Sequence, residues 1–185
     1  MLLVRPAMEH LPSYRDALLR DWSPDNINLL VATRRELAAI ADDPERFIEL
    51  MEDRACLGGD ITLPDGSTAR RLPGFRRWMW HDGEFVGSIG LRWQPGTSEL
   101  PPHVLGHIGY SVVPWHHRRG FGTDALRQIL PVAKAEGLAH VYITTQPDNE
   151  ASRKVILSNG GVFLGEYTEA AAYGGRVGHK YRIAL

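Results

Sequence analysis

The chain has 185 residues, a formal net charge of −1 and one cysteine, Cys56, which suits a single domain over residues 1–185 with a substantial core and no intrachain disulfide. The near-neutral charge argues against a general nucleic-acid-binding protein, because such proteins carry a clustered basic excess. No stretch approaches the roughly 20 apolar residues that span a bilayer, and no N-terminal run has the character of a signal peptide, so we expect a cytoplasmic protein with no membrane or nucleic-acid partner.

The N-terminal part of the chain is expected to hold one short strand and then helices. Residues 2–6 form a strand signal closed by proline. Apolar residues at helical spacing predict a helix over residues 12–22, which Ser23-Pro24 ends. A second helix is expected over residues 34–41, and Asp43-Pro44-Glu45 supplies the cap, the first-turn proline and the carboxylate that begin a third.

Turn residues divide the middle of the chain into hairpins. Pro64-Asp65-Gly66 is the centre of a small surface hairpin. Asp82-Gly83 is a strong hairpin signal and joins expected strands over residues 75–81 and 85–93. Residues 94–104 contain three prolines and one glycine, so we expect a long loop of the kind that often carries function.

The segment from Gly106 to Thr123 is the most informative part of the chain. A β-branched run ends at Pro114, four basic or potentially basic residues follow, and then Gly120 and Gly122 open a helix. Glycine permits close backbone approach, and the first turn of a helix offers unpaired N–H groups at the positive end of the helix dipole. The segment therefore predicts a site for a phosphorylated cofactor, although its spacing fits neither the P-loop nor the dinucleotide-binding fingerprint.

The C-terminal third is expected to alternate helices and strands. The helix after Gly122 ends near Gly137, with a bend expected at Pro131. A buried strand over residues 140–145 follows, and then a helix that begins at the N-cap Asn149 and exits at Asn159-Gly160. The last two strands are expected over residues 162–167 and 179–185, with a glycine-rich loop between them.

The run His117-Arg118-Arg119-Gly120-Phe121-Gly122 resembles the Gln/Arg-x-x-Gly-x-Gly/Ala signature of the GNAT superfamily of acyl-CoA-dependent N-acyltransferases, with His117 in place of the usual Gln or Arg. The neighbouring elements, Asn149, Ser152 and Asn159-Gly160 match the family in order and spacing. The resemblance extends from about Leu105 to Phe163. It implies an α/β fold with a mixed, mostly antiparallel central sheet flanked by helices, in which the fourth and fifth strands splay apart.

The resemblance also implies an N-acetyltransferase that moves the acetyl group of acetyl-CoA to a primary amine by direct attack in a ternary complex. The main chain at Val112 and Val113 would hold the pantetheine arm, and backbone N–H groups of the glycine turn would hold the pyrophosphate. The glycines could instead be ordinary turn residues, and Asn149 could only cap a helix. The expected cofactor-binding residues are Val112, Val113, His117, Arg118, Arg119, Gly120, Phe121, Gly122, Thr123, Asn149 and Ser152.

One position departs from the family. A tyrosine on the last helix often supplies the proton to the leaving thiolate, and Ile156 stands at that position here. The replacement candidates for acid and base are His107 and Tyr110, then Glu99 and Tyr173. His107 has the most suitable unperturbed pKa, near 6.5, but a single histidine on a strand is also an ordinary structural residue. The tryptophans that either wall an acceptor pocket or pack in the core are Trp78, Trp80, Trp93 and Trp115.

The remaining expectations concern metals, partners and an alternative function. His103 and His107 would lie about 13 Å apart on one strand, too far to share a zinc ion, so no metal is expected. The partner is a small-molecule or peptide amine, with polyamines, antibiotics, amino acids and protein amines all open, and a homodimer is left open as well. The alternative function, motivated by Ile156, is a non-catalytic acyl-CoA-binding or regulatory module. The acceptor pocket is expected between the first two helices and the segments 94–104 and 169–178.

Overall fold

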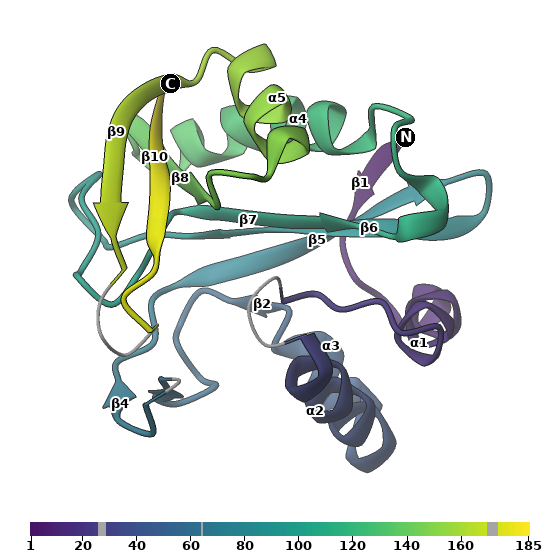
Figure 1. Ribbon diagram of the computed structural model, residues 1–185. Coiled ribbons are helices and arrows are strands. Elements are labelled where there is room, and N and C mark those ends of the chain that lie inside the picture. The colour runs from purple at the N-terminus through teal and green to yellow at the C-terminus, as the bar shows by residue number, and fades with distance from the viewer. Residues whose placement is uncertain (26–28, 64, 170–173) are drawn as a thin grey trace.

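The computed structural model describes residues 1–25, 29–63, 65–169 and 174–185, which form two adjoining antiparallel sheets with helices on both faces (Figure 1). The first sheet has the order β1-β5-β6-β7, with β2 paired to β5. Its strands are β1 (Leu2–Val4), β2 (Glu52–Asp53), β5 (Gly74–His81), β6 (Glu84–Arg92) and β7 (Ile108–Val112). The second sheet has the order β8-β10-β9 and consists of β8 (His140–Thr145), β9 (Val162–Thr168) and β10 (Val177–Ala184).

The helices divide between the two faces of the sheets. One side carries α1 (Leu11–Leu19), α2 (Leu29–Asp42) and α3 (Pro44–Glu49), and the other carries α4 (Phe121–Ala135) and α5 (Glu150–Ser158) (Figure 1). Short 3-10 turns, η1 (Met8–His10) and η2 (Pro114–His116), precede α1 and α4, and a small hairpin joins β3 (Ile61–Thr62) to β4 (Thr68–Ala69). No described helix is long and apolar enough to cross a membrane.

The predicted fold is confirmed, and so are most of its local signals. Asp43 caps α3 by accepting a hydrogen bond from the N–H of Arg46 at 2.8 Å, and Asn149 caps α5 in the same way. The strand over residues 140–145 has the predicted bounds. Helix α4 continues through Pro131 to Ala135, so the proline does not end it. The expected splayed fourth and fifth strands are β7 and β8, which belong to different sheets.

Two apolar clusters hold the layers together. The larger cluster lies between the sheets and the α4–α5 pair and includes Ile89, Leu126 and Ile156, all fully buried. The smaller cluster lies under α1 and α3, where the ring of Tyr14 stacks on that of Trp78 with 4.4 Å between centroids. Each face of the sheet therefore has its own core, and the strands are buried between them.

A polar cluster is enclosed within the smaller core. Glu36 of α2 is 5% exposed, accepts a hydrogen bond from the Tyr14 hydroxyl and pairs with Arg76 of β5 at 2.7 Å. Burial and the neighbouring Glu36 carboxylate raise the pKa of Tyr14, so its phenol stays protonated and donates to the carboxylate. These contacts fix α1 and α2 against β5 because a buried carboxylate is stable only while its partners remain.

We predict that Arg76→Met destabilises the protein by about 3 kcal/mol, because it leaves the Glu36 carboxylate buried without its cation. Arg46→Met is the matched control: Arg46 pairs with Glu49 at 3.0 Å on the exposed surface, and loss of such a pair costs less than about 0.5 kcal/mol. Urea denaturation of both variants measures the difference. Equal unfolding free energies would show that the buried pair makes no special contribution.

Candidate functional site

The two sheets meet at His107 and separate beyond it. The N–H of His107 donates to the carbonyl of Tyr142 at 2.8 Å, and the N–H of Tyr142 donates to Nδ1 of the His107 ring at 2.9 Å. A Cβ on Gly106 would lie 3.1 Å from the same Tyr142 carbonyl, so this glycine permits the close approach of the two chains. His107 and Tyr142 thus join β7 and β8 at one end of what we call the β7–β8 split.

The open edge of β7 lies at Val112. The bonds from Arg92 N–H to the His107 carbonyl and from Val113 N–H to the Val86 carbonyl, at 2.9 and 3.0 Å, belong to the alternating ladder with β6. In an antiparallel ladder, residues that bond to the neighbouring strand alternate with residues whose N–H and C=O groups point away from it. Val112 therefore faces the split, while the Val113 N–H is already used. Of the two valines expected to bind pantetheine, Val112 is the one with a main-chain N–H directed there.

The turn between β7 and α4 forms a concave backbone. Arg118 and Gly120 have φ angles of +59° and +79°, and Gly120 is the N-cap of α4. Within the described part of the chain, the N–H groups from Arg118 to Thr123 have no hydrogen-bond acceptor. Left-handed residues in a turn direct successive N–H groups toward one point, and the helix dipole adds positive potential there. The sequence predicted a site for a phosphorylated cofactor at this turn, and its concave backbone is compatible with a bound anion.

Several side chains of this turn stabilise it through hydrogen bonds and an ion pair. Nε2 of His117 lies 3.0 Å from the Val112 carbonyl and so ties the turn to the end of β7. Arg119 donates to Nδ1 of His116 at 2.7 Å, and Nε2 of His116 pairs with Glu84 at 2.8 Å. The Phe121 side chain is buried in the larger core, so its N–H is the group that faces the turn. Arg118 and Thr123 complete the expected set, Arg118 exposed and Thr123 half-buried.

Gly122, the second glycine predicted to bind the cofactor, lies against β7 and α5. A Cβ there would lie 3.5 to 3.8 Å from Val155, Tyr110 and Val112 rather than in the concave face of the turn. These are ordinary van der Waals distances, so a Cβ at this position would pack against β7 and α5. Gly120, with open space around its Cβ position and a left-handed backbone, is the glycine that shapes the turn.

Tyr110 and Ser152 lie together where α5 begins. The Tyr110 hydroxyl is 2.9 Å from Oγ of Ser152, whose N–H donates to the Asn149 side chain at 3.0 Å. Burial raises the pKa of Tyr110 to about 12, so its hydroxyl stays protonated at neutral pH. Ile156 is fully buried in the larger core. The family's tyrosine position is therefore a packing position here, and the hydroxyls near it come from β7 and from the first turn of α5.

His107 is fully buried. Burial, helped by the positive charges of His140, Arg92 and Lys180 and opposed by Glu99, lowers its pKa to about 4. The imidazole is therefore neutral at physiological pH, and its Nδ1 is occupied by the Tyr142 N–H. The structure thus gives this residue a hydrogen-bonding position at the junction of the sheets, which the sequence could not distinguish from a base.

The other sequence candidates are dispersed. Glu99 accepts from the Tyr142 hydroxyl at 3.1 Å and lies 3.4 Å from Nε2 of His140, while Tyr173 lies outside the described residues. The tryptophans largely serve packing: Trp78 and Trp93 are buried, Trp80 packs against the smaller core, and Trp115 lies 3.5 Å beneath the guanidinium of Arg20. In the described ranges no three His, Cys, Asp or Glu side chains are grouped to hold a metal ion.

Sequence reasoning missed the contacts that fasten α1 to β7. The indole N–H of Trp22 donates to Oγ of Ser111 at 3.0 Å, and the Ser111 hydroxyl donates to the carbonyl of Ser23 at 3.1 Å. These residues lie on the face of β7 opposite Tyr110, next to the split. A lone serine in a strand carries no sequence signal of such a role.

The comparisons with known proteins decide the family. A family model described as the acetyltransferase (GNAT) domain matches residues 17–162. The chain belongs to the GNAT acetyltransferase family. A curated relative, the uncharacterized N-acetyltransferase YoaA of Bacillus subtilis (strain 168), is 30% identical over 78 residues, which are 42% of this chain and 41% of YoaA. The chain thus matches about two fifths of that relative's length.

Solved structures of GNAT acetyltransferases share the fold. The microcin C7 self-immunity acetyltransferase MccE, in complex with acetyl-CoA and AMP, aligns with a TM-score of 0.63 and 13% identity, over 99% of this chain and 91% of MccE. RimL, a ribosomal L7/L12 alpha-N-protein acetyltransferase in complex with coenzyme A, also aligns with a TM-score of 0.63, at 14% identity, over 99% of this chain and 93% of RimL. At these identities the likeness concerns the fold alone.

We predict that protein stability falls as the pH is lowered from about 6.5 to 4 through His107. Its folded pKa, about 4, is below its unfolded value of about 6.5. Above this pH window the His107 imidazole is neutral in both the folded and the unfolded protein. Within the window the unfolded chain takes up a proton that the folded protein does not, so the free energy of unfolding falls by about 3 kcal/mol in total.

The comparison for this prediction is His107→Asn, which keeps an acceptor near the Tyr142 N–H but does not titrate. Unfolding free energies from pH 7 to 4 should converge for the two proteins as the pH falls, because the other groups around the site, His140, Arg92, Glu99 and Lys180, are common to both. Parallel pH profiles would contradict a buried neutral imidazole.

Proposed function

We propose that the protein is an acetyl-CoA-dependent N-acetyltransferase whose single domain, residues 1–185, acetylates a primary amine by direct attack. The observation that carries the proposal is that, among the described residues, no acceptor bonds the N–H groups from Arg118 to Thr123 beside the β7–β8 split. The pyrophosphate of coenzyme A matches such a site because fixed backbone donors need no ionisation and no reorganisation. Arg118 and Arg119 add positive charge at the same turn.

The same geometry suggests how the acyl group is held. The pantetheine arm has amide groups that can pair with an exposed strand edge, and Val112 offers that edge within the split. An N–H aimed at the thioester carbonyl stabilises the negative charge that develops on its oxygen during attack. His117 supports this arrangement by fixing the Val112 carbonyl at 3.0 Å, which couples the turn to the strand edge.

Proton balance fits direct attack. The amine has to lose a proton, while a CoA thiolate with a pKa of about 8.5 is a tolerable leaving group near neutral pH. We propose that the Tyr110 and Ser152 hydroxyls, 2.9 Å apart, are the nearest protein source of a proton for that thiolate. His107 and Tyr110 are the acid–base candidates predicted from the sequence. The buried imidazole of His107 suits a supporting position better. The substrate amine then either loses its proton to water or enters the site already deprotonated.

The alternative function is a non-catalytic acyl-CoA-binding or regulatory module, which the buried Ile156 motivates. Steady release of thiol from acetyl-CoA across a panel of amines supports the enzyme. Micromolar binding of acetyl-CoA without turnover of any amine supports the module. Absence of binding would reject both functions.

We predict that Gly120→Ala lowers CoA affinity by about tenfold, because it strains the left-handed backbone that aligns the N–H groups. Gly137→Ala is the control, since Gly137 ends the same helix with a φ of +88° and, like Gly120, has no atom near its Cβ position. Both variants should lose about 1 kcal/mol of stability. Calorimetry should find weaker CoA binding only for Gly120→Ala, and equal affinities would remove the turn from the site.

We also predict that Tyr110→Phe lowers kcat by less than about tenfold, because the thiolate can depart as an anion. In the parent, kcat should rise with pH and stay level up to pH 10, since the pKa of Tyr110 is about 12 and its hydroxyl remains protonated. The pH–rate profiles of both proteins test this. A fall in kcat above pH 9 that disappears in Tyr110→Phe would mean that this tyrosine is an essential acid with an ordinary pKa.

A further inference from the structure

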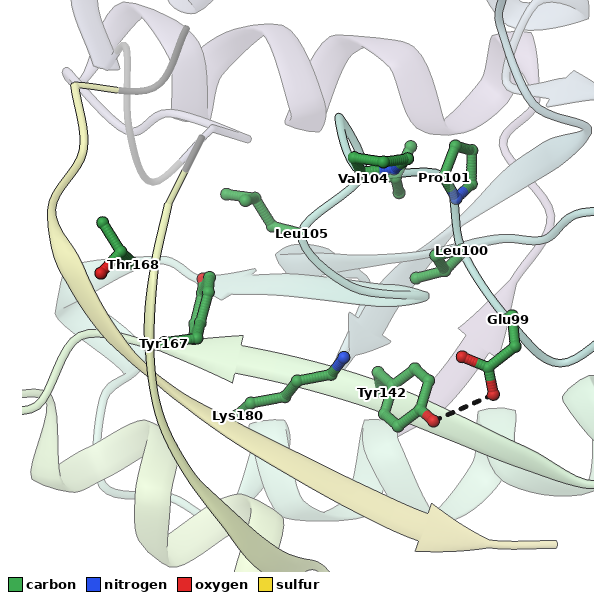
Figure 2. A pocket seen from close by; sticks show the side chains of 10 residues that line it. Glu99, Leu100, Pro101, Val104, Leu105, Tyr142, Tyr167, Thr168 and Lys180 are labelled. Atoms are coloured by element: carbon green, nitrogen blue, oxygen red, sulfur yellow. Dashed lines mark hydrogen bonds between the residues drawn. The ribbon is translucent and has the colours of Figure 1, made fainter. Parts of the chain in front are cut away.

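A cavity of about 150 Å³ lies over β8 and β10, on the side of the sheets opposite α4 and α5 (Figure 2). The loop before β7 covers it, and its walls are the apolar side chains of Leu100, Pro101, Val104 and Leu105. A space of this size accommodates one benzene-sized group, whereas complete small-molecule sites measure roughly 300–1,000 Å³. The cavity therefore suits one side chain of a larger ligand.

The ammonium of Lys180 enters this cavity from its floor (Figure 2). Lys180 is half-buried, and its Nζ lies 3.9 Å from the centroid of the Tyr142 ring. Across the described ranges no carboxylate pairs with it, and the residues outside those ranges include no Asp or Glu. A half-buried cation that rests only on an aromatic face gains when an anion reaches it.

The carboxylate of Glu99 does not fill that role. It lies at the rim of the cavity, where it accepts from the Tyr142 hydroxyl at 3.1 Å and faces His140 at 3.4 Å. Its side chain is 66% exposed, and no ion pair joins it to Lys180 in the part of the chain that the structure describes. The cavity thus has an ammonium on its floor, apolar walls and a carboxylate already engaged at its edge.

The cavity adjoins the side of the β7–β8 split that an acceptor can reach. Helices α4 and α5 cover the other face (Figure 1). Tyr142, on the cavity floor, is bonded to His107 at the junction, and Val112 lies five residues farther along β7, or roughly 16 Å at about 3.3 Å per residue. An extended peptide with its terminal amine at Val112 would bring a side chain three to five residues downstream to Lys180.

We propose that Lys180 and the cavity around it bind an acidic side chain of a peptide acceptor, about the fourth residue from the reacting amine. This inference rests on the proposed N-acetyltransferase function and names its acceptor class. A polyamine is disfavoured in the same cavity because its charges would meet the Lys180 ammonium. Gly178 supports the cavity, since a Cβ there would lie 2.6 Å from the ring of Tyr167, one of the lining residues.

The test compares two peptides, Ala-Ala-Ala-Glu-Ala amide and Ala-Ala-Ala-Gln-Ala amide, by calorimetry on the CoA-saturated protein. We expect the Glu peptide to bind about tenfold more tightly, as one desolvated charge pair would provide. Lys180→Met should abolish this preference. Arg182→Met is the matched control, because Arg182 lies two residues away on β10, is exposed and does not line the cavity.

Equal binding of the two peptides, including no binding of either, would overturn the inference, as would a preference that survives in Lys180→Met. CoA affinity, measured in each variant, confirms that the fold is intact. Thiol release from acetyl-CoA with a panel of other amines is measured separately. Turnover of those amines without a Glu preference leaves the enzyme proposal standing and rejects only the acceptor class, whereas absence of all turnover rejects the enzyme.

Discussion

The separation of β7 from β8 is the constraint on which the rest of the structure depends. A continuous sheet would use the N–H groups of β7 in ladder bonds, and no edge would remain for a ligand. Here the side chain of His107 takes the place of one ladder acceptor for Tyr142, and the two strands join different sheets. The two bonds between His107 and Tyr142 lie at the closed end of this split, and the proposed binding edge at Val112 lies at its open end.

An open strand edge inside a protein stays open only if the elements on both faces of the sheet are held in place. On one side, α4 and α5 pack on the larger core and the Gly120 turn brings a row of backbone N–H groups to the end of β7. On the other, Trp22 and Ser23 bond to Ser111, and α1 and α2 are fastened through the Glu36–Arg76 pair. The two cores thus support opposite sides of the proposed site. A substitution in either core is therefore expected to change the affinity for a ligand there.

Much of the fold could be predicted because its signals are local. Each of these signals determines the structure of only the few residues around it. Examples are the turn at Asp82-Gly83, the caps Asp43 and Asn149, and the glycine turn before α4. The bounds of β8 and the family signature followed from the same kind of information. Helix α4 continues past Pro131 to Ala135 and packs on the larger core, and the bend expected at this proline stays a prediction.

By itself the sequence determined the order of most elements, the glycine turn before α4 and the family, since each is carried by neighbouring residues along the chain. The tertiary structure decided the roles of single side chains. Burial makes His107 a neutral acceptor and places Ile156 in the core. Packing sets Gly122 against β7 and α5 and puts Lys180 in a cavity where no carboxylate of the described residues forms an ion pair with it. Solvation and long-range partners set these properties, and neither is encoded in the spacing of residues along the chain.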